Sequence, residues 1–220
     1  MAGEDPRWDE KRTLTGVAAW QDMTKAKPKI LLFVLDLSYS MQSDSRLPAC
    51  KEALLSVLND HCADKDRVGL ISFADDVRYE CPIAAKDYAA MRPKVQAMRP
   101  RGRTAFYSAV LQALRDAAGL GEPDTPKWVV ALTDGEDTSS RAGDLDHCMP
   151  LLHDSPNLNL ALITVGNIAS QGGYDRLIQA CSVGTHSNQG ILINAANSAQ
   201  ISEAFGKVAE AMNAGVVEHL

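Results

Sequence analysis

The stretch "DLSYSM", residues 36–41, places one carboxylate and two serine hydroxyls directly after an apolar run. That run, "ILLFVL", is typical of a strand buried in a core. Asp36, Ser38 and Ser40 therefore follow one another closely where the chain leaves the core. Taken alone, the pattern fits a nucleophile, a phosphate cradle, a metal site or a polar turn.

Two further segments carry polar residues at comparable places. The apolar run "WVVAL" ends in "TDGED", which contains Asp134, and "RPRGRTAFYSA" places Thr104 at the start of an expected helix. In open α/β sheets, ligands bind beyond the carboxyl ends of strands, where the strand order reverses. If the strands that end at Asp36 and Asp134 are neighbours there, two carboxylates and three hydroxyls converge.

The converging side chains are all hard oxygen donors: Asp36, Ser38, Ser40, Thr104 and Asp134. The absence of His and Cys argues against zinc and favours Mg²⁺, with Mn²⁺ and Ca²⁺ as alternatives. The three hydroxyls are expected to bind the ion directly, and the two carboxylates directly or through water. Because only the carboxylates are charged, the ion would still attract one more anionic ligand.

The elements that position these residues alternate along the chain, which predicts a doubly wound α/β fold. We expect a mostly parallel six-stranded sheet with helices on both faces. The predicted strands are 29–36, 67–74, 77–84, 126–134, 157–166 and 190–196. The predicted helices are 43–62, 86–98, 104–119, 143–154, 171–182 and 198–213. Pro82 favours an antiparallel edge position for 77–84, and Ser43, Asp44 and Ser45 are expected to cap the following helix.

The order of these motifs resembles the von Willebrand factor type A (vWA) domain. The resemblance rests on D-x-S-x-S-M at 36–41, on Thr104 two residues after Gly102, and on T-D-G at 133–135. It covers residues 29–213, leaving 1–28 as an N-terminal arm and 214–220 as a C-terminal tail. It implies a Rossmann-like fold with a metal-ion-dependent adhesion site (MIDAS) made of the five oxygen-bearing residues.

The resemblance also implies a function, namely a non-enzymatic protein-interaction module. In this family the open coordination position of the metal typically accepts an acidic residue of a partner protein, and many intracellular members are scaffolds. Tyr39 stands where the family often has Gly, so we expect it on the rim of the site. Glu136, Arg101 and Arg103 are the other expected rim residues.

The basic residues before Thr104 allow two interpretations. Arg99, Arg101 and Arg103 either pair with acidic residues in a solvated loop, or form a basic collar that steers an acidic partner toward the metal.

Two other functions remain open at this stage: a metal-dependent hydrolase or phosphatase, and a structural subunit of a larger complex. The chain lacks a GxxxxGK[ST] phosphate loop and a GxSxG nucleophile elbow. It also has Ser38 where haloacid-dehalogenase phosphatases have a second Asp. A hydrolase would need a base such as Glu136.

Composition limits the classes of partner. The 220 residues contain 22 Lys and Arg against 28 Asp and Glu, a net charge of −6, which does not favour nucleic-acid binding. The five cysteines lack CxxC spacing and lie mostly in apolar stretches, as in a reducing compartment. No apolar run approaches the ~20 residues of a membrane span, and no secretory signal is recognisable. We therefore expect a cytoplasmic protein.

Overall fold

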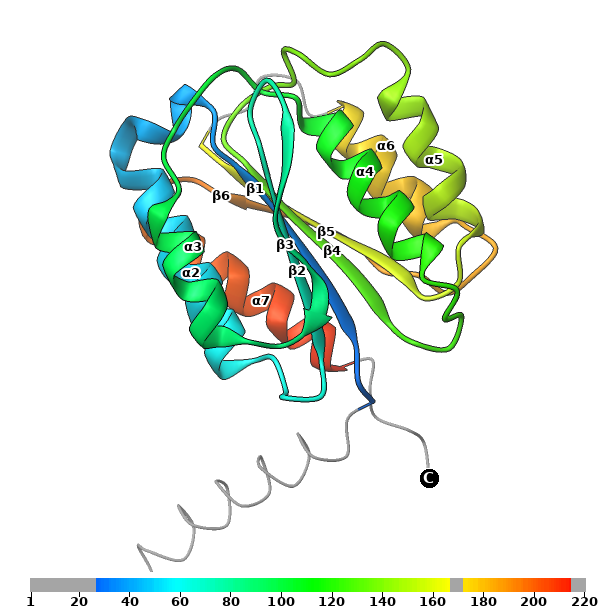
Figure 1. Ribbon diagram of the computed structural model, residues 1–220. Coiled ribbons are helices and arrows are strands. Elements are labelled where there is room, and N and C mark those ends of the chain that lie inside the picture. Colours follow the sequence, from blue (N-terminus) through cyan, green and yellow to red (C-terminus); the bar gives the residue numbers. More distant parts are fainter. Residues whose placement is uncertain (1–26, 167–171, 215–220) are drawn as a thin grey trace, which may run out of the picture.

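The computed structural model describes residues 27–166 and 172–214 and contains a six-stranded sheet of order β3-β2-β1-β4-β5-β6 (Figure 1). The strands are β1 (Ile30–Asp36), β2 (Arg67–Phe73), β3 (Val77–Ala85), β4 (Lys127–Thr133), β5 (Leu158–Val165) and β6 (Gly190–Ala195). All neighbouring pairs are parallel except β2 and β3, which are antiparallel. This arrangement confirms the predicted fold class, including the antiparallel edge strand.

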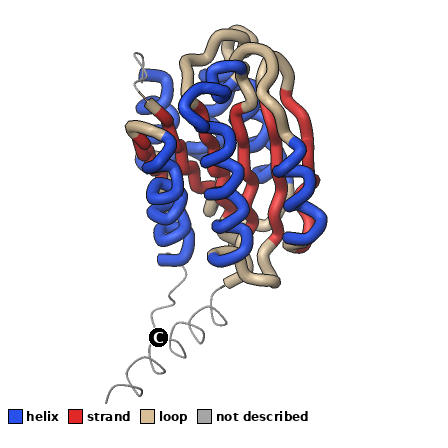
Figure 2. The backbone as a smooth tube through the Cα atoms, turned by 90° about the vertical axis from the view of Figure 1, so that its left-hand side faces the viewer, coloured by secondary structure: helices blue, strands red, loops and turns tan. Residues whose placement is uncertain are grey.

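Helices cover both faces of the sheet (Figures 1 and 2). One face carries α2 (Arg46–Asp60), α3 (Tyr88–Ala97) and α7 (Ile201–Ala214), and the other carries α4 (Phe106–Gly119), α5 (Asp144–Asp154) and α6 (Gly172–Ser182). Two short 3-10 helices, η1 (Tyr39–Ser45) and η2 (Ser198–Gln200), precede α2 and α7. Within the described residues, no helix is long and apolar enough to cross a membrane.

The central strand β1 is buried on both faces, which explains its continuous apolar run. Leu31, Phe33 and Leu35 pack into the core under α2 and α7, whereas Leu32 and Val34 pack into the core under α4. Side chains of a strand alternate between its faces, so a strand covered on both sides must be apolar throughout.

The strand order reverses between β1 and β4. The chain passes from β1 to β2 and β3 on one side, and then crosses through α4 to β4 on the other side of β1. Leu35 is in register with Leu132, so Asp36 ends its strand beside Thr133. The carboxyl ends of β1 and β4 thus meet at the switch point, the position at which open α/β sheets bind ligands.

The link from β1 to α2 differs from the sequence-based expectation. Ser45 occupies the N-cap position of α2, but its backbone is left-handed and its side chain makes no capping hydrogen bond. Asp44 is also left-handed, with φ of 51°. Its carboxylate faces the Arg46 guanidinium at 3.4 Å. The prediction that these residues cap the helix is therefore wrong, because the chain first turns through η1 and enters α2 from a kink.

Candidate metal centre

Asp36 lies at the end of β1 and organises the turn that follows it. Its Oδ1 accepts a hydrogen bond from the Ser38 main-chain N–H at 2.7 Å, and its Oδ2 accepts one from the Thr133 hydroxyl at 2.6 Å. An Asp that accepts from the main chain two residues later favours a local turn. The three polar residues therefore come together because the chain bends at Ser38.

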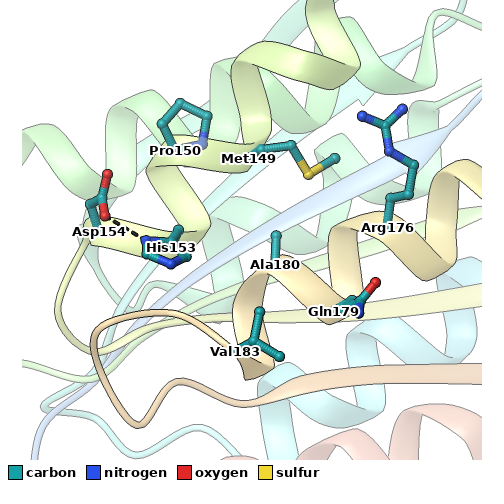
Figure 3. A pocket seen from close by; sticks show the side chains of 8 residues that line it. All are labelled: Met149, Pro150, His153, Asp154, Arg176, Gln179, Ala180 and Val183. Carbon is teal, nitrogen blue, oxygen red and sulfur yellow. Dashed lines mark hydrogen bonds and ion pairs between the residues drawn. The ribbon is translucent and has the colours of Figure 1, made fainter.

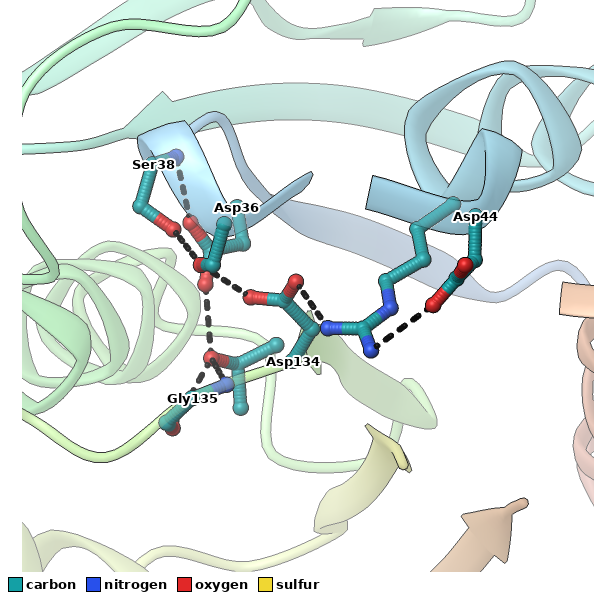
Figure 4. Close-up of polar contacts among 8 residues, drawn as sticks. Asp36, Ser38, Asp44, Asp134 and Gly135 are labelled. Atoms are coloured by element: carbon teal, nitrogen blue, oxygen red, sulfur yellow. Dashed lines mark hydrogen bonds and ion pairs between the residues drawn. The ribbon is translucent and has the colours of Figure 1, made fainter. Parts of the chain in front are cut away.

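A continuous chain of polar contacts joins the two strand ends (Figure 4). The hydroxyls of Ser38 and Ser40 are 2.9 Å apart, and the Ser40 hydroxyl donates to Asp134 Oδ1 at 2.6 Å. Asp134 Oδ2 accepts from Arg46 Nη1 at 2.7 Å. Hydrogen bonds therefore link four of the five residues expected at the metal site in one series, from Asp36 through Ser38 and Ser40 to Asp134.

Thr104 is buried in the same cluster. Its hydroxyl and that of Ser40 each lie 3.9 Å from the point where a Cβ on Gly135 would stand. Main-chain bonds fix it there, because the Thr104 carbonyl accepts from Thr138 N–H at 2.8 Å and from Ser139 N–H at 3.1 Å. Thr104 precedes α4, which begins at Phe106, so it lies in the loop and not at the start of the helix.

Gly102 permits the loop before Thr104 to approach the site. Its φ is +59°, and a Cβ at this position would overlap the carboxylate of Asp75. Hydrogen bonds join this loop to the end of β1, from Arg101 N–H to the Leu37 carbonyl and from Tyr39 N–H to the Gly102 carbonyl. A residue with a side chain would have to shift the loop and Thr104 with it.

Asp36 is a buried carboxylate that forms no ion pair with a cation of the described residues. It is 0% exposed, and no Lys, Arg or His among residues 27–166 and 172–214 forms an ion pair with it. Burial raises its pKa to about 6, against the opposing effect of hydrogen bonds from Thr133 and Ser38. Buried charges in proteins are normally paired or bound to a metal, so this carboxylate favours a cation beside it.

The raised pKa predicts a pH effect on the stability of the metal-free protein. The pKa of Asp36 rises from 3.8 to about 6 on folding, so the folded state prefers the protonated acid. The associated stability is present below pH 3.8 and is lost as the pH rises through about 6. From pH 4 to pH 7, wild type should lose about 2 kcal/mol of unfolding free energy relative to Asp36→Asn.

Urea denaturation in EDTA at several pH values measures this difference. Other titrating groups are common to both proteins and cancel. Parallel pH profiles for wild type and Asp36→Asn would contradict the assigned burial of a charged carboxylate.

Arg46 and Thr133 belong to the cluster, although the sequence analysis did not assign them to it. Arg46 lies in the first turn of α2, where the helix dipole disfavours a cation, so its pairing with Asp134 compensates for an unfavourable position. A cation at the start of a helix is an unfavourable placement, but it does not identify the partner of Arg46. Thr133, at the end of β4, holds the end of β1 beside it through its hydrogen bond to Asp36.

The expected rim residues surround the cluster in different ways. Tyr39 is 63% exposed, and Glu136 is also exposed. Arg101 forms an ion pair with Asp76, and Arg103 pairs with Asp75 at 3.1 Å. These two ion pairs match the solvated-loop interpretation for Arg101 and Arg103, whereas Arg99 donates to main-chain carbonyls, and a role in partner binding stays a prediction.

The donor set fits a hard divalent cation. Its carboxylate and hydroxyl oxygens are the ligands that Mg²⁺ prefers, and Asp36 supplies a buried carboxylate that is not paired with any described cation. Ser40 is exposed, so the cluster is open on that side. Among the described residues, no three His, Cys, Asp or Glu side chains form a metal-binding group. A metal here would therefore depend on the hydroxyls as well as on the two carboxylates.

A separate groove of about 410 Å³ lies between α5 and α6 (Figure 3). Met149, Ala180 and Val183 supply apolar lining, and His153 at its edge bonds the Asp154 carboxylate at 2.6 Å. No residue of the oxygen cluster lines this groove. It is therefore distinct from the candidate metal centre.

Comparison with protein families identifies one match. Residues 31–136 match the model of the von Willebrand factor type A domain. The matched segment includes Asp36, Ser38, Ser40, Thr104 and Asp134. No curated protein sequence matches the chain.

Solved structures of the same fold are similar over most of the chain. A von Willebrand factor type A protein from Catenulispora acidiphila aligns with TM-score 0.70 and 19% identity, covering 85% of this chain and 43% of that one. BatB from Bacteroides thetaiotaomicron aligns with a TM-score of 0.63 and 19% identity, and the alignment covers 83% of this chain and 99% of BatB. Proximal thread matrix protein 1 from the mussel byssus, solved with a zinc-occupied MIDAS motif, is also similar. It aligns with a TM-score of 0.64 and 17% identity, and the alignment covers 84% of this chain and 48% of the mussel protein. The chain thus spans less than half of the Catenulispora and mussel proteins.

Proposed function

We propose that this chain, whose residues 31–136 match the model of the von Willebrand factor type A domain, binds an acidic residue of a partner protein through a divalent metal ion. Domains of this family are typically adhesion or protein-interaction modules and usually lack catalytic activity. The observation that carries the proposal is the Asp36 carboxylate, which is 0% exposed and has no described cationic partner, beside the hydroxyls at the switch point.

The residues of the cluster have two roles, holding the ion and orienting the residues that hold it. Asp36, Ser38, Ser40, Thr104 and Asp134 would hold the ion, which would offer a coordination position to a carboxylate. Thr133 orients Asp36, and Arg46 orients Asp134 while offsetting its charge. With one of the two carboxylates offset, a divalent cation would leave the cluster with a net positive charge. An acidic residue of the partner would neutralise that charge.

The exposed surface around the cluster favours a protein ligand. Tyr39 stands 63% exposed on the turn that carries Ser38 and Ser40. Aromatic side chains bury a large area at little cost in conformational entropy and are enriched in interfaces. Tyr39 would thus pack against the partner chain next to its acidic residue. We further propose that the chain acts as a scaffold inside the cell.

A pulldown in Mg²⁺ and in EDTA tests this function. The full chain is immobilised and exposed to native lysate, and the retained proteins are identified by mass spectrometry. We expect a partner that is retained in Mg²⁺ and lost in EDTA. Parallel arms with Mn²⁺, Ca²⁺ and Zn²⁺ rank the metals, since the mussel neighbour holds zinc.

Two variants make the pulldown specific. Asp36→Asn should lose the partner in Mg²⁺, whereas Asp154→Asn, an exposed residue of α5 outside the cluster, should retain it. A partner retained equally in EDTA would refute metal-dependent capture. Magnesium-dependent hydrolysis of a phosphoester by wild type, absent from Asp36→Asn, would instead support the hydrolase alternative.

A further inference from the structure

A basic cleft adjoins the candidate metal centre. The cleft has a volume of about 380 Å³ and lies among β3, the end of α3 and the loop that leads to Thr104. Its charged lining comprises Arg78, Lys94, Arg99, Arg101 and Glu80. Leu37, which separates Asp36 from Ser38, also lines it, so one residue of the metal-site turn forms part of the cleft wall.

The wall shared with the metal centre is fixed by the main chain. Arg101 N–H donates to the Leu37 carbonyl at 2.5 Å, and Tyr39 N–H donates to the Gly102 carbonyl at 3.1 Å. The turn that carries the exposed Tyr39 and Ser40 is therefore joined directly to the wall of the cleft.

The carboxylates of the cleft are outnumbered and already engaged. Glu80 accepts from the Ser72 hydroxyl at 2.6 Å. Asp76 is half-exposed and forms ion pairs with both Arg78 and Arg101 of the cleft lining. Two carboxylates thus face four cations, which leaves a net positive charge in the cleft.

Lys94 and Arg99 are held by main-chain oxygens. Lys94 donates to the Glu80 carbonyl at 2.9 Å, and Arg99 donates to the carbonyls of Gln96 and Met98 at the end of α3. No carboxylate within residues 27–166 and 172–214 forms an ion pair with either cation. Carbonyl oxygens therefore position these two cations, and no carboxylate of the described residues is paired with them.

Lys51 adds a further cation at the same helix end. It donates to the carbonyls of Gln96 and Met98 at 3.1 Å and 2.6 Å, the same oxygens that Arg99 uses. Burial, and then the nearby charge of Arg99, lower the pKa of Lys51. Like charges have been brought together here, and an anionic ligand would relieve their repulsion.

We propose that this cleft binds a second acidic side chain of the same partner segment whose first acidic residue reaches the metal. The inference rests on the proposed function and defines its ligand as an acidic peptide with at least two carboxylates. The cations come from β3, α3 and the loop and face a cleft, and the adjoining helix end presents carbonyls. Arg and Lys side chains bind phosphate as well as carboxylate. The choice of a carboxylate follows from the position of the cleft, which shares Leu37 with the turn of the metal centre, where the proposed ligand is an acidic residue.

Fluorescence anisotropy with labelled synthetic peptides tests the cleft directly. The probes are a decapeptide of alternating Glu and Gly, the matching Gln–Gly peptide, and a Gly-rich decapeptide with one Glu. In Mg²⁺, wild type should bind the multi-Glu peptide at least about tenfold more tightly than the single-Glu peptide. Equal affinities would overturn the proposal.

Two variants alter the charge of the cleft by different routes. Lys94→Gln/Arg99→Gln removes two cations but keeps hydrogen-bond donors, and Ala97→Glu adds a carboxylate to the exposed end of α3 without removing any contact. Each variant should lower the affinity for the multi-Glu peptide about tenfold and leave the affinity for the single-Glu peptide unchanged. Mg²⁺ affinity by calorimetry should not change. If both variants are folded and bind the multi-Glu peptide as tightly as wild type, the cleft does not bind the second acidic side chain.

The controls separate this inference from the metal-dependent function. In EDTA or in Asp36→Asn, the multi-Glu peptide should retain weak, salt-sensitive binding that Ala97→Glu removes. If binding were independent of Mg²⁺ throughout but sensitive to Ala97→Glu, the metal function would fail and the cleft would stand. Stronger competition by inorganic phosphate than by glutarate would overturn the acidic-peptide assignment in favour of a phosphate site.

Discussion

Replacing Asp36 by Asn should abolish divalent-metal binding while leaving the fold intact. The Asn carbonyl can accept from Ser38 N–H, and its amide can face the Thr133 hydroxyl, which lies 3.3 Å from the Gly135 carbonyl as an alternative acceptor. The geometry is thus kept and the buried charge is removed. Loss of a residue that only orients a ligand costs about 10–100-fold in metal affinity, so loss of a charged ligand should exceed about 100-fold.

Calorimetric titration with Mg²⁺ and Mn²⁺ measures the effect, and circular dichroism in EDTA establishes that the variant is folded. Asp154→Asn serves as the matched control, because it makes the same chemical change at an exposed position of α5. Metal affinity of Asp36→Asn within about tenfold of wild type would show that this carboxylate is not a ligand.

Replacing Arg46 by Gln should have opposite effects on the two ligands of the site. The guanidinium lies 2.7 Å from Asp134 Oδ2, where it occupies one oxygen and offsets one charge. Without it, the cluster would be more negative, and Mg²⁺ affinity should rise about tenfold. The metal-loaded site would then carry less positive charge, so affinity for the carboxylate of a single-Glu peptide should fall about tenfold.

Arg46→Lys separates charge from shape in this experiment. Lys keeps the positive charge but loses the planar fork of donors. If charge compensation is the role of Arg46, the Lys variant should resemble wild type in both titrations. If Gln and Lys behave alike, or if metal and peptide affinity move in the same direction, the assigned role is wrong.

The sequence predicted the fold well because its elements are strongly periodic. The continuous apolar run before Asp36 indicated a strand buried on both faces, and β1 is buried at every position. Pro82 indicated an edge, and β3 is the antiparallel edge strand. A strand covered on both faces requires apolar residues throughout, and a proline within a sheet is tolerated best on an edge strand, so each pattern indicates one environment.

The site was less predictable than the fold. Motif order brought Asp36, Ser38, Ser40, Thr104 and Asp134 together, but their metal-binding role remains a prediction. Arg46 could not be placed, because its partner Asp134 is distant in sequence and the kink at Asp44 and Ser45 turns it toward the site. Two left-handed non-glycine residues in a row have no strong sequence signature, so the expected helix cap was wrong there.

The pairing of β1 with β4 also has a consequence for how the protein is assembled. The Thr133–Asp36 bond spans 97 residues and the Ser40–Asp134 bond spans 94, with β2, β3, α3 and α4 lying between. Contacts of such long sequence separation form slowly, because a large loop must close before they contribute. During synthesis, no growing chain that ends before β4 can hold these oxygens together. Metal ions would consequently bind only after the central strand pair has closed, and would stabilise the completed sheet over every earlier intermediate.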